Sequence, residues 1–150
     1  MKTTHHAELD RAEGVELPVW QAPNDDVHLT LNGDHAKIIF QVWDDQAKYS
    51  SHCGVLDFSQ MWGIRCERNK DLSYYPNMSD DEYKSCYWVV PNSSWLRKLQ
   101  SERNQDFPGW EKYDKSEYVH YIVQSNKFYI EIIAASIKFS RLLCCEQIKP

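Results

Sequence analysis

The pattern of apolar and polar positions predicts a chain built mainly of β-strands. Within residues 27–45, two β-prone runs flank Asn32-Gly33, a strong hairpin signal because both residues tolerate a positive φ. Residues 50–68 predict one long bent strand or two strands, with Gly54 and Gly63 as weak points or candidate bulges.

One segment has the features of a helix. Residues 93–104 are preceded by Pro91, and Asn92, Ser93 and Ser94 are candidates for the N-cap. Pro108 with Gly109 stops further extension. The apolar face that we expect to pack on the sheet consists of Trp95, Leu96 and Leu99. The preceding run, residues 85–90, predicts another strand.

Residues 116–136 predict a second hairpin, with an ionisable group in each apolar arm. A turn at Ser125-Asn126 places His120 directly opposite Glu131, whereas a three-residue loop would separate the two. Both faces of this hairpin are apolar, so we expect it in the middle of a sheet and covered on both sides. The apolar residues after Tyr129 are dense enough to fit a partly helical structure as well.

These elements predict a single α+β domain over residues 1–150. We expect a mainly antiparallel sheet of about five to seven strands with one or two packed helices. Residues 1–14 have little apolar surface to bury and predict either a short helix or a flexible arm.

Charge is unevenly distributed along the chain, whose net charge is −5. Residues 1–82 carry 15 acidic and 7 basic side chains, and residues 83–150 carry 7 acidic and 10 basic ones. An acidic first half disfavours binding to nucleic acid, which requires clustered Lys and Arg. It favours a partner with a basic surface, although negative charge also serves simply to keep a small protein soluble.

The cysteines indicate a reducing environment. There are five, an odd number, and no two form a CxxC motif. The first residues contain no apolar leader, and no apolar run approaches the ~20 residues of a membrane span. We therefore expect a cytoplasmic protein with free thiols.

Candidates for catalysis are few. His120 and Glu131 would suit an acid/base pair or, as the simpler interpretation, a structural pair on a covered face. Cys53 is a weaker candidate, as a nucleophile with His120 as its base, and an inert buried thiol is the alternative. Phosphate-binding motifs and metal-ligand spacings are absent from the sequence, so we expect no cofactor and no metal.

Acidic dipeptides next to aromatic residues predict a partner-binding surface. Solvated loop tips are the alternative interpretation. The candidate partner-binding residues are Trp43, Asp44, Asp45, Asp80, Asp81 and Tyr83. In overall type, being compact, acidic, α+β and without a catalytic signature, the chain resembles small toxin-neutralising immunity proteins, and no specific motif carries that likeness.

Three functions therefore remain open at the level of sequence. The first is a non-enzymatic module that binds a basic protein, with neutralisation of a toxin as its specific form. The second is a small enzyme or small-molecule binder with a pocket around His120 and Glu131. The third is a structural subunit that assembles through an apolar face of its sheet.

Overall fold

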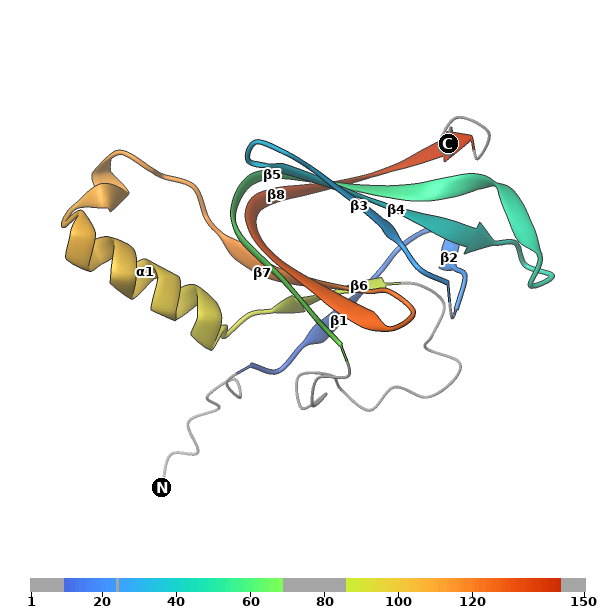
Figure 1. The fold of residues 1–150 in the computed structure, drawn as a ribbon, viewed down its shortest axis with the longest axis horizontal. Coiled ribbons are helices and arrows are strands. Elements are labelled where there is room, and N and C mark those ends of the chain that lie inside the picture. Colours follow the sequence, from blue (N-terminus) through green and yellow to red (C-terminus); the bar gives the residue numbers. More distant parts are fainter. Residues whose placement is uncertain (1–9, 24, 69–85, 144–150) are drawn as a thin grey trace, which may run out of the picture.

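A computed structural model describes residues 10–23, 25–68 and 86–143. Within these residues, eight antiparallel strands form one sheet, accompanied by one α-helix (Figure 1). The strands are β1 (Glu13–Glu16), β2 (Trp20–Gln21), β3 (His28–Asn32), β4 (His35–Trp43), β5 (Tyr49–Arg68), β6 (Cys86–Val90), β7 (Val119–Gln124) and β8 (Phe128–Leu143). Their order is β1-β6-β7-β8-β5-β4-β2, and β3 pairs with β4 on the same side as β2.

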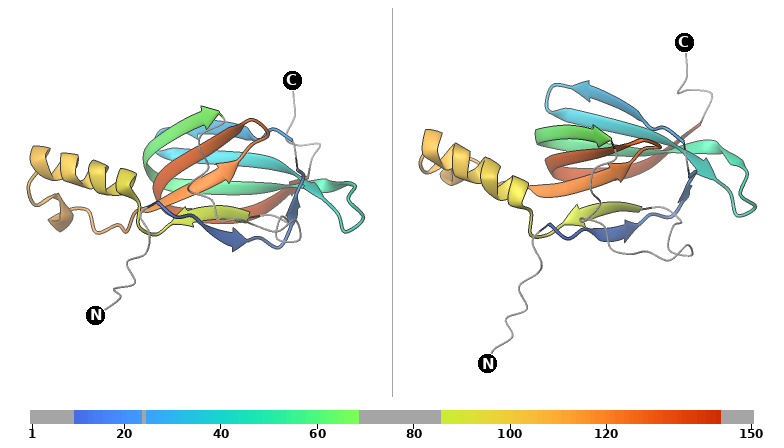
Figure 2. Two further views of the ribbon diagram at one scale, coloured as in Figure 1. Left: turned by 90° about the horizontal axis from the view of Figure 1, so that it is seen from below. Right: turned by 60° about the horizontal axis from the view of Figure 1, so that its bottom comes forward.

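The sheet curls because its two edge strands are neighbours in sequence. β1 and β2 lie at opposite ends of the strand order, yet only residues 17–19 connect them. The four Cα–Cα steps from Glu16 to Trp20 span at most about 14 Å. The two edges must therefore approach each other, and Figure 2 shows the resulting strong curvature.

The curl encloses the main hydrophobic core on the concave face. β4 illustrates the pattern, because its even-numbered residues are buried whereas its odd-numbered residues are more exposed. The buried residues of this core are Ala36, Ile38, Phe40, Val42, Leu56, Phe58, Tyr121, Val123, Ile130, Ile132 and Ala134. Leu17 and Val19, from the connection between the two edges, pack against this core.

The mainly antiparallel sheet is confirmed, but the predicted number of strands is too low. The difference arises at β1 and β2, which have four and two residues. The sequences of strands this short and this polar contain no alternation of apolar and polar residues that would predict them. They form because a partner strand lies beside them. β1 pairs with β6, and β2 pairs with the end of β4.

The β3–β4 hairpin is confirmed, with its turn one residue further along than predicted. Asn32 pairs with His35, so Gly33 and Asp34 are the two central residues. Gly33 has a φ of 60°, and Asp34 is not among the residues with positive φ. A positive φ at the first central position alone is the pattern of a type II′ turn, for which glycine is the preferred residue.

Both glycines of β5 have identifiable roles, but only one marks a bulge. The pairing with β8 shifts between Met61 and Gly63, so that β5 continues through a bend as a single strand. Gly54 instead makes room for the ring of Phe40 on the neighbouring strand. A Cβ atom at Gly54 would overlap the ring of Phe40.

The predicted helix is confirmed as α1 (Ser94–Asp106), with Ser93 as its N-cap. Its packing differs from the prediction, because α1 projects from one end of the sheet and none of its residues is fully buried (Figure 2). Trp95 and Leu99 lie against Gly63 at the bend of β5. The predicted apolar face is therefore only half-buried.

We call α1 and the segment between α1 and β7 the helical arm. A second set of contacts connects the far part of this arm to the sheet. The guanidinium of Arg103 lies 4.4 Å from the ring centre of Trp62 and 4.7 Å from that of Trp110, which begins the 3-10 helix η3 (Trp110–Lys112). Arg103 also bonds the carboxylate of Asp114 at 3.1 Å. Hydrogen bonds from Tyr118 and from the backbone lower the pKa of Asp114 to about 2.

The described part of the predicted N-terminal arm is held in place. The backbone N–H of Asp10 donates to Asn92 O at 3.1 Å, and its carboxylate accepts bonds from the backbone and hydroxyl of Ser94 at 2.8 and 2.6 Å. β1 then begins at Glu13. Residues 10–14 therefore contact the rest of the domain, residues 1–9 lie outside the described part of the chain, and the flexible arm stays a prediction.

Candidate functional site

His120 and Glu131 meet in the middle of the sheet, but not in the predicted register. His120 pairs with Ile133, and Glu131 pairs with Ile122. The turn between β7 and β8 lies at residues 126–127 rather than at Ser125-Asn126, because Ser125 N donates to Phe128 O at 2.8 Å. Moving the turn by one residue shifts the pairing by two, so both side chains stay on one face and face each other diagonally.

The expected covering of both faces of this hairpin is confirmed. β7 and β8 lie between β6 and β5, and β8 is a strand through Leu143 rather than partly helical. Ile122 on one face and Ile132 on the other are each 0% exposed. His120 is 0% and Glu131 1% exposed, so the pair lies fully inside the protein.

Two further side chains, Arg65 and Ser93, bond to this pair, so that four side chains from four segments form one network. His120 Nε2 lies 2.9 Å from Oε1 of Glu131. Arg65 holds the same carboxylate through two bonds, Nε to Oε2 at 2.8 Å and Nη2 to Oε1 at 3.0 Å. On the other side of the imidazole, Ser93 Oγ lies 2.7 Å from Nδ1.

Ser93 also connects the network to the helix. Its Oγ accepts the backbone N–H of Leu96 at 3.0 Å and thereby caps α1. If the Ser93 hydroxyl donates to Nδ1 of His120, Nε2–H is left to donate to Glu131, and each of these groups has a partner. Both ring nitrogens of His120 therefore have a hydrogen-bond partner, Ser93 on the helix side and Glu131 on the sheet side.

The surroundings of Glu131 stabilise its charge. Burial opposes ionisation, but hydrogen bonds from His120 and Arg65 outweigh it and lower the pKa of the carboxyl group to about 2. Trp95 covers the pair, with its ring 4.2 Å from the guanidinium of Arg65 and edge-on to His120 at 5.2 Å. The acid and base of this network are buried and bonded to each other, an arrangement that favours the structural interpretation of the pair, and no observation tests a catalytic role.

The structure does not bring Cys53 to His120. Cys53 pairs with Leu142 whereas His120 pairs with Ile133, and nine residues of β8 correspond to roughly 30 Å along an extended strand. The neighbouring His52 is exposed, whereas Cys53 is buried. The strand geometry therefore places neither His52 nor His120 where it could act as a base for the thiol of Cys53.

The second predicted site lies at the end of the sheet where β2, β4 and β5 meet. Trp20 pairs with Trp43, and Trp43 in turn pairs with Tyr49. The three rings pack edge to face, with centroid distances of 5.3 Å from Trp20 to Trp43 and 6.3 Å from Trp43 to Tyr49. Such aromatic clusters present a large and rigid contact area.

Two acidic pairs border these rings. Tyr49 donates its hydroxyl hydrogen to Oδ2 of Asp25 at 2.8 Å, and this bond raises the pKa of Tyr49. Asp44 accepts two backbone bonds of its own turn through Oδ1, from Gln46 N at 2.9 Å and from Lys48 N at 3.0 Å. We call this region the acidic-aromatic surface. It consists of Trp20, Asp25, Asp26, Trp43, Asp44, Asp45 and Tyr49.

Part of this surface is hollowed. Asp25, Asp26, Gln41 and Tyr49 line an open depression of about 410 Å³. Tyr49 is 60% exposed at its edge, and Asp26, Asp44 and Asp45 are exposed. The hollow therefore places carboxylates and an aromatic ring around a space open to solvent.

Of the predicted partner-binding residues, Trp43, Asp44 and Asp45 lie on the acidic-aromatic surface. Asp80, Asp81 and Tyr83 lie outside the described residues. The structure adds Tyr49 and Asp25, whose contact joins two segments 24 residues apart. The Asp25-Asp26 dipeptide is visible in the sequence, but its proximity to Tyr49 depends on the pairing of strands.

Comparison of the chain with protein-family models, with curated proteins and with solved structures finds no match. No helix in the described part of the chain is long and apolar enough to cross a membrane. Those residues also contain no group of three or more His, Cys, Asp or Glu side chains arranged to hold a metal ion.

Proposed function

We propose that this chain is a non-enzymatic protein-binding module that takes a partner with a basic surface through its acidic-aromatic surface. The observation that carries the proposal is the contact chain Trp20–Trp43–Tyr49–Asp25. It gathers the pairs Asp25-Asp26 and Asp44-Asp45 at one end of the sheet.

Charge and aromatic area have complementary effects in such a surface. Four carboxylates attract a basic partner over distances of about 10 Å and speed its encounter. Half-buried tryptophans and an exposed tyrosine then offer contact area that is already ordered, so little side-chain entropy is lost on binding. Acidic surfaces repel the phosphates of nucleic acid, so the partner class is a protein.

An immunity-type protein that neutralises a basic toxin, such as a nuclease, is the specific form of this function. A nuclease must present a cationic surface to bind its substrate, and an acidic module that covers this surface would block it. Support for the module itself comes from the acidic-aromatic surface. Whether the chain neutralises a toxin depends on the identity of this basic partner.

The test compares three forms of the full chain in affinity capture from cell extract. In the surface variant, Asp25, Asp26, Asp44 and Asp45 are all changed to Asn, which keeps the acceptor oxygens for Tyr49 and for the 44–48 turn. The control variant removes the same charge from the helical arm, through Glu102→Gln, Asp106→Asn, Glu111→Gln and Glu117→Gln, all at exposed positions.

We expect basic proteins to be captured by the unmodified chain and by the arm control, and to be lost with the surface variant or at high salt. Capture of the same proteins by the surface variant would contradict the proposed function. A captured toxin whose activity the chain inhibits would support the specific form, whereas a basic partner without toxic activity would support the binding module alone.

A further inference from the structure

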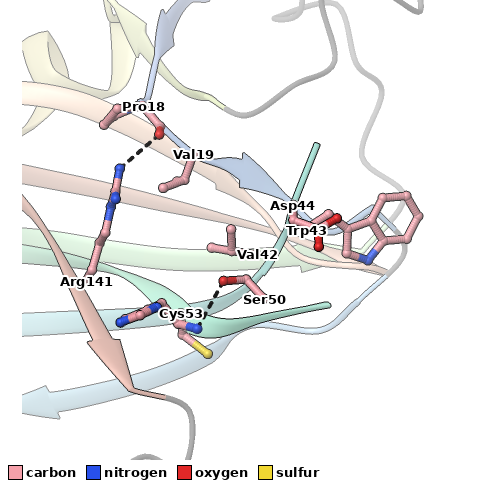
Figure 3. Close-up of a pocket in the computed structure, with 9 residues that line it drawn as sticks. Pro18, Val19, Val42, Trp43, Asp44, Ser50, Cys53 and Arg141 are labelled. Atoms are coloured by element: carbon pink, nitrogen blue, oxygen red, sulfur yellow. Dashed lines mark hydrogen bonds between the residues drawn. The ribbon is translucent and has the colours of Figure 1, made fainter. Parts of the chain in front are cut away.

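The open end of the curled sheet contains a pocket of about 250 Å³, most of whose lining residues lie outside the acidic-aromatic surface (Figure 3). Pro18 and Val19, from the connection between β1 and β2, form one wall, and Val42 of β4 forms the apolar floor. His52 near the start of β5 and Arg141 near the end of β8 supply polar groups. Mouths of curled sheets are frequent sites for small ligands, with apolar walls and a few directed polar groups.

Arg141 has donors to spare in this pocket. Its Nη2 donates to Pro18 O at 3.1 Å, which fixes the guanidinium at the rim. A guanidinium carries five N–H donors, and no other partner of Arg141 is recorded in the part of the chain that the structure describes. The remaining donors match the two oxygens of a carboxylate.

His52 is a second polar residue that lines the pocket. Its Nδ1 lies 3.2 Å from Ser51 Oγ, and the described residues supply no recorded partner for Nε2. Asp44 lies on the opposite side of the pocket from Arg141 (Figure 3). A ligand with one anionic end and an apolar body therefore fits, whereas a second anionic group would face the carboxylate of Asp44.

We propose that this pocket binds a small organic monocarboxylate, with its carboxylate on Arg141 and its apolar chain along Val19 and Val42. Binding here does not depend on a protein partner, although Trp43 and Asp44 also belong to the acidic-aromatic surface. The predicted order of affinity is monocarboxylate over dicarboxylate over amine.

Titration of the isotope-labelled full chain, followed by amide NMR shifts, tests this order with three probes of the same chain length. Hexanoate is expected to shift the signals of Val19, Val42 and His52. Adipate should bind more weakly because its second carboxylate meets Asp44, and hexylamine should not produce these shifts. Since all three probes are applied to the unmodified chain, the comparison does not depend on the folding of a variant.

Two variants test whether the carboxylate of hexanoate binds to Arg141. Arg141→Gln is expected to weaken hexanoate binding about tenfold or more, as for the loss of a charge-assisted hydrogen bond. Lys138→Gln removes the same charge three residues away on the other face of β8 and should change the affinity by less than about twofold. No shifts with millimolar hexanoate, equal binding to the Arg141→Gln chain, or adipate binding as tightly as hexanoate would each overturn the assignment.

Discussion

The imidazole of His120 and the carboxylate of Glu131 are 2.9 Å apart, in diagonal positions on one face of the β7–β8 hairpin. This contact completes a line of hydrogen bonds from Arg65 on β5 to Ser93 at the start of α1. The network therefore joins β5, the start of α1 and the neighbouring strands β7 and β8 through one buried histidine–carboxylate pair. We infer that the network determines where the helical arm attaches to the sheet.

Replacing Glu131 by Gln tests the energetic weight of this network. The change removes the negative charge and with it the ion pair between Arg65 and Glu131 beside the buried imidazole. Loss of one member of a buried pair costs about 3–5 kcal/mol, and because Arg65 is partly exposed we expect about 3 kcal/mol in the free energy of unfolding. Urea unfolding measures this, with Glu102→Gln on the exposed side of α1 as a control expected to stay within about 0.5 kcal/mol. Equal stability of both variants would show that the network contributes little.

The pH dependence of stability provides a separate test. The pKa of Glu131 is about 2 in the folded chain, against an ordinary value of 4.5. Because the unfolded chain takes up this proton more readily, acid favours unfolding. The contribution of Glu131, about 3 kcal/mol, is fully present above pH 4.5 and is lost as the pH falls toward 2. Asp114 has a lowered pKa as well, so the difference between the unmodified chain and Glu131→Gln isolates Glu131. A constant difference between the two chains from pH 6 to pH 2 would contradict this linkage.

Ser93 has two roles, and its removal should affect both. Ser93→Ala deletes the cap of α1 and removes the hydroxyl that lies 2.7 Å from Nδ1 of His120. We expect a loss of about 2 kcal/mol in the free energy of unfolding. Ser101→Ala, at an exposed position in the same helix, is the matched control and should change the stability by less than about 0.5 kcal/mol. A loss at Ser93 no larger than at Ser101 would mean that the helix attaches by other contacts.

The close contact between Gly54 and Phe40 predicts that position 54 tolerates no side chain larger than a hydrogen atom. A Cβ at Gly54 would overlap the Phe40 ring, so Gly54→Ala should cost about 2–3 kcal/mol. Phe40→Leu shortens the opposing side chain, and the double variant should be more stable than the two separate losses predict. Additive losses in thermal or urea unfolding would indicate that the strand moves aside instead.

Much of this architecture can be read from local pattern. The alternation in β4, the glycine turn before it and the cap at Ser93 each have a local physical cause, and all three are seen in the structure. The meeting of His120 with Glu131 was predictable because the period of a strand places both on one face, even though the turn position was wrong by one residue.

Other features depend on contacts between distant segments and leave no local signal. β2 is a strand only because β4 lies beside it. Arg65 reaches Glu131 through the pairing of β5 with β8, and its type alone does not distinguish it from other basic residues. Tyr49 joins the acidic-aromatic surface through its pairing with Trp43, which depends on the register shift between β4 and β5. Sheet register therefore accounts for most of what the sequence could not predict.

The dissociation constant of the captured basic partner for Tyr49→Ala and Tyr113→Ala chains tests the central claim most directly. Both tyrosines are well exposed, at 60% and 92%, but only Tyr49 lies on the acidic-aromatic surface. Calorimetry should show at least about tenfold weaker binding for Tyr49→Ala, as for truncation of an aromatic anchor, and no significant change for Tyr113→Ala. Unchanged affinity for Tyr49→Ala, or a larger loss for Tyr113→Ala, would place the interface elsewhere and contradict the account.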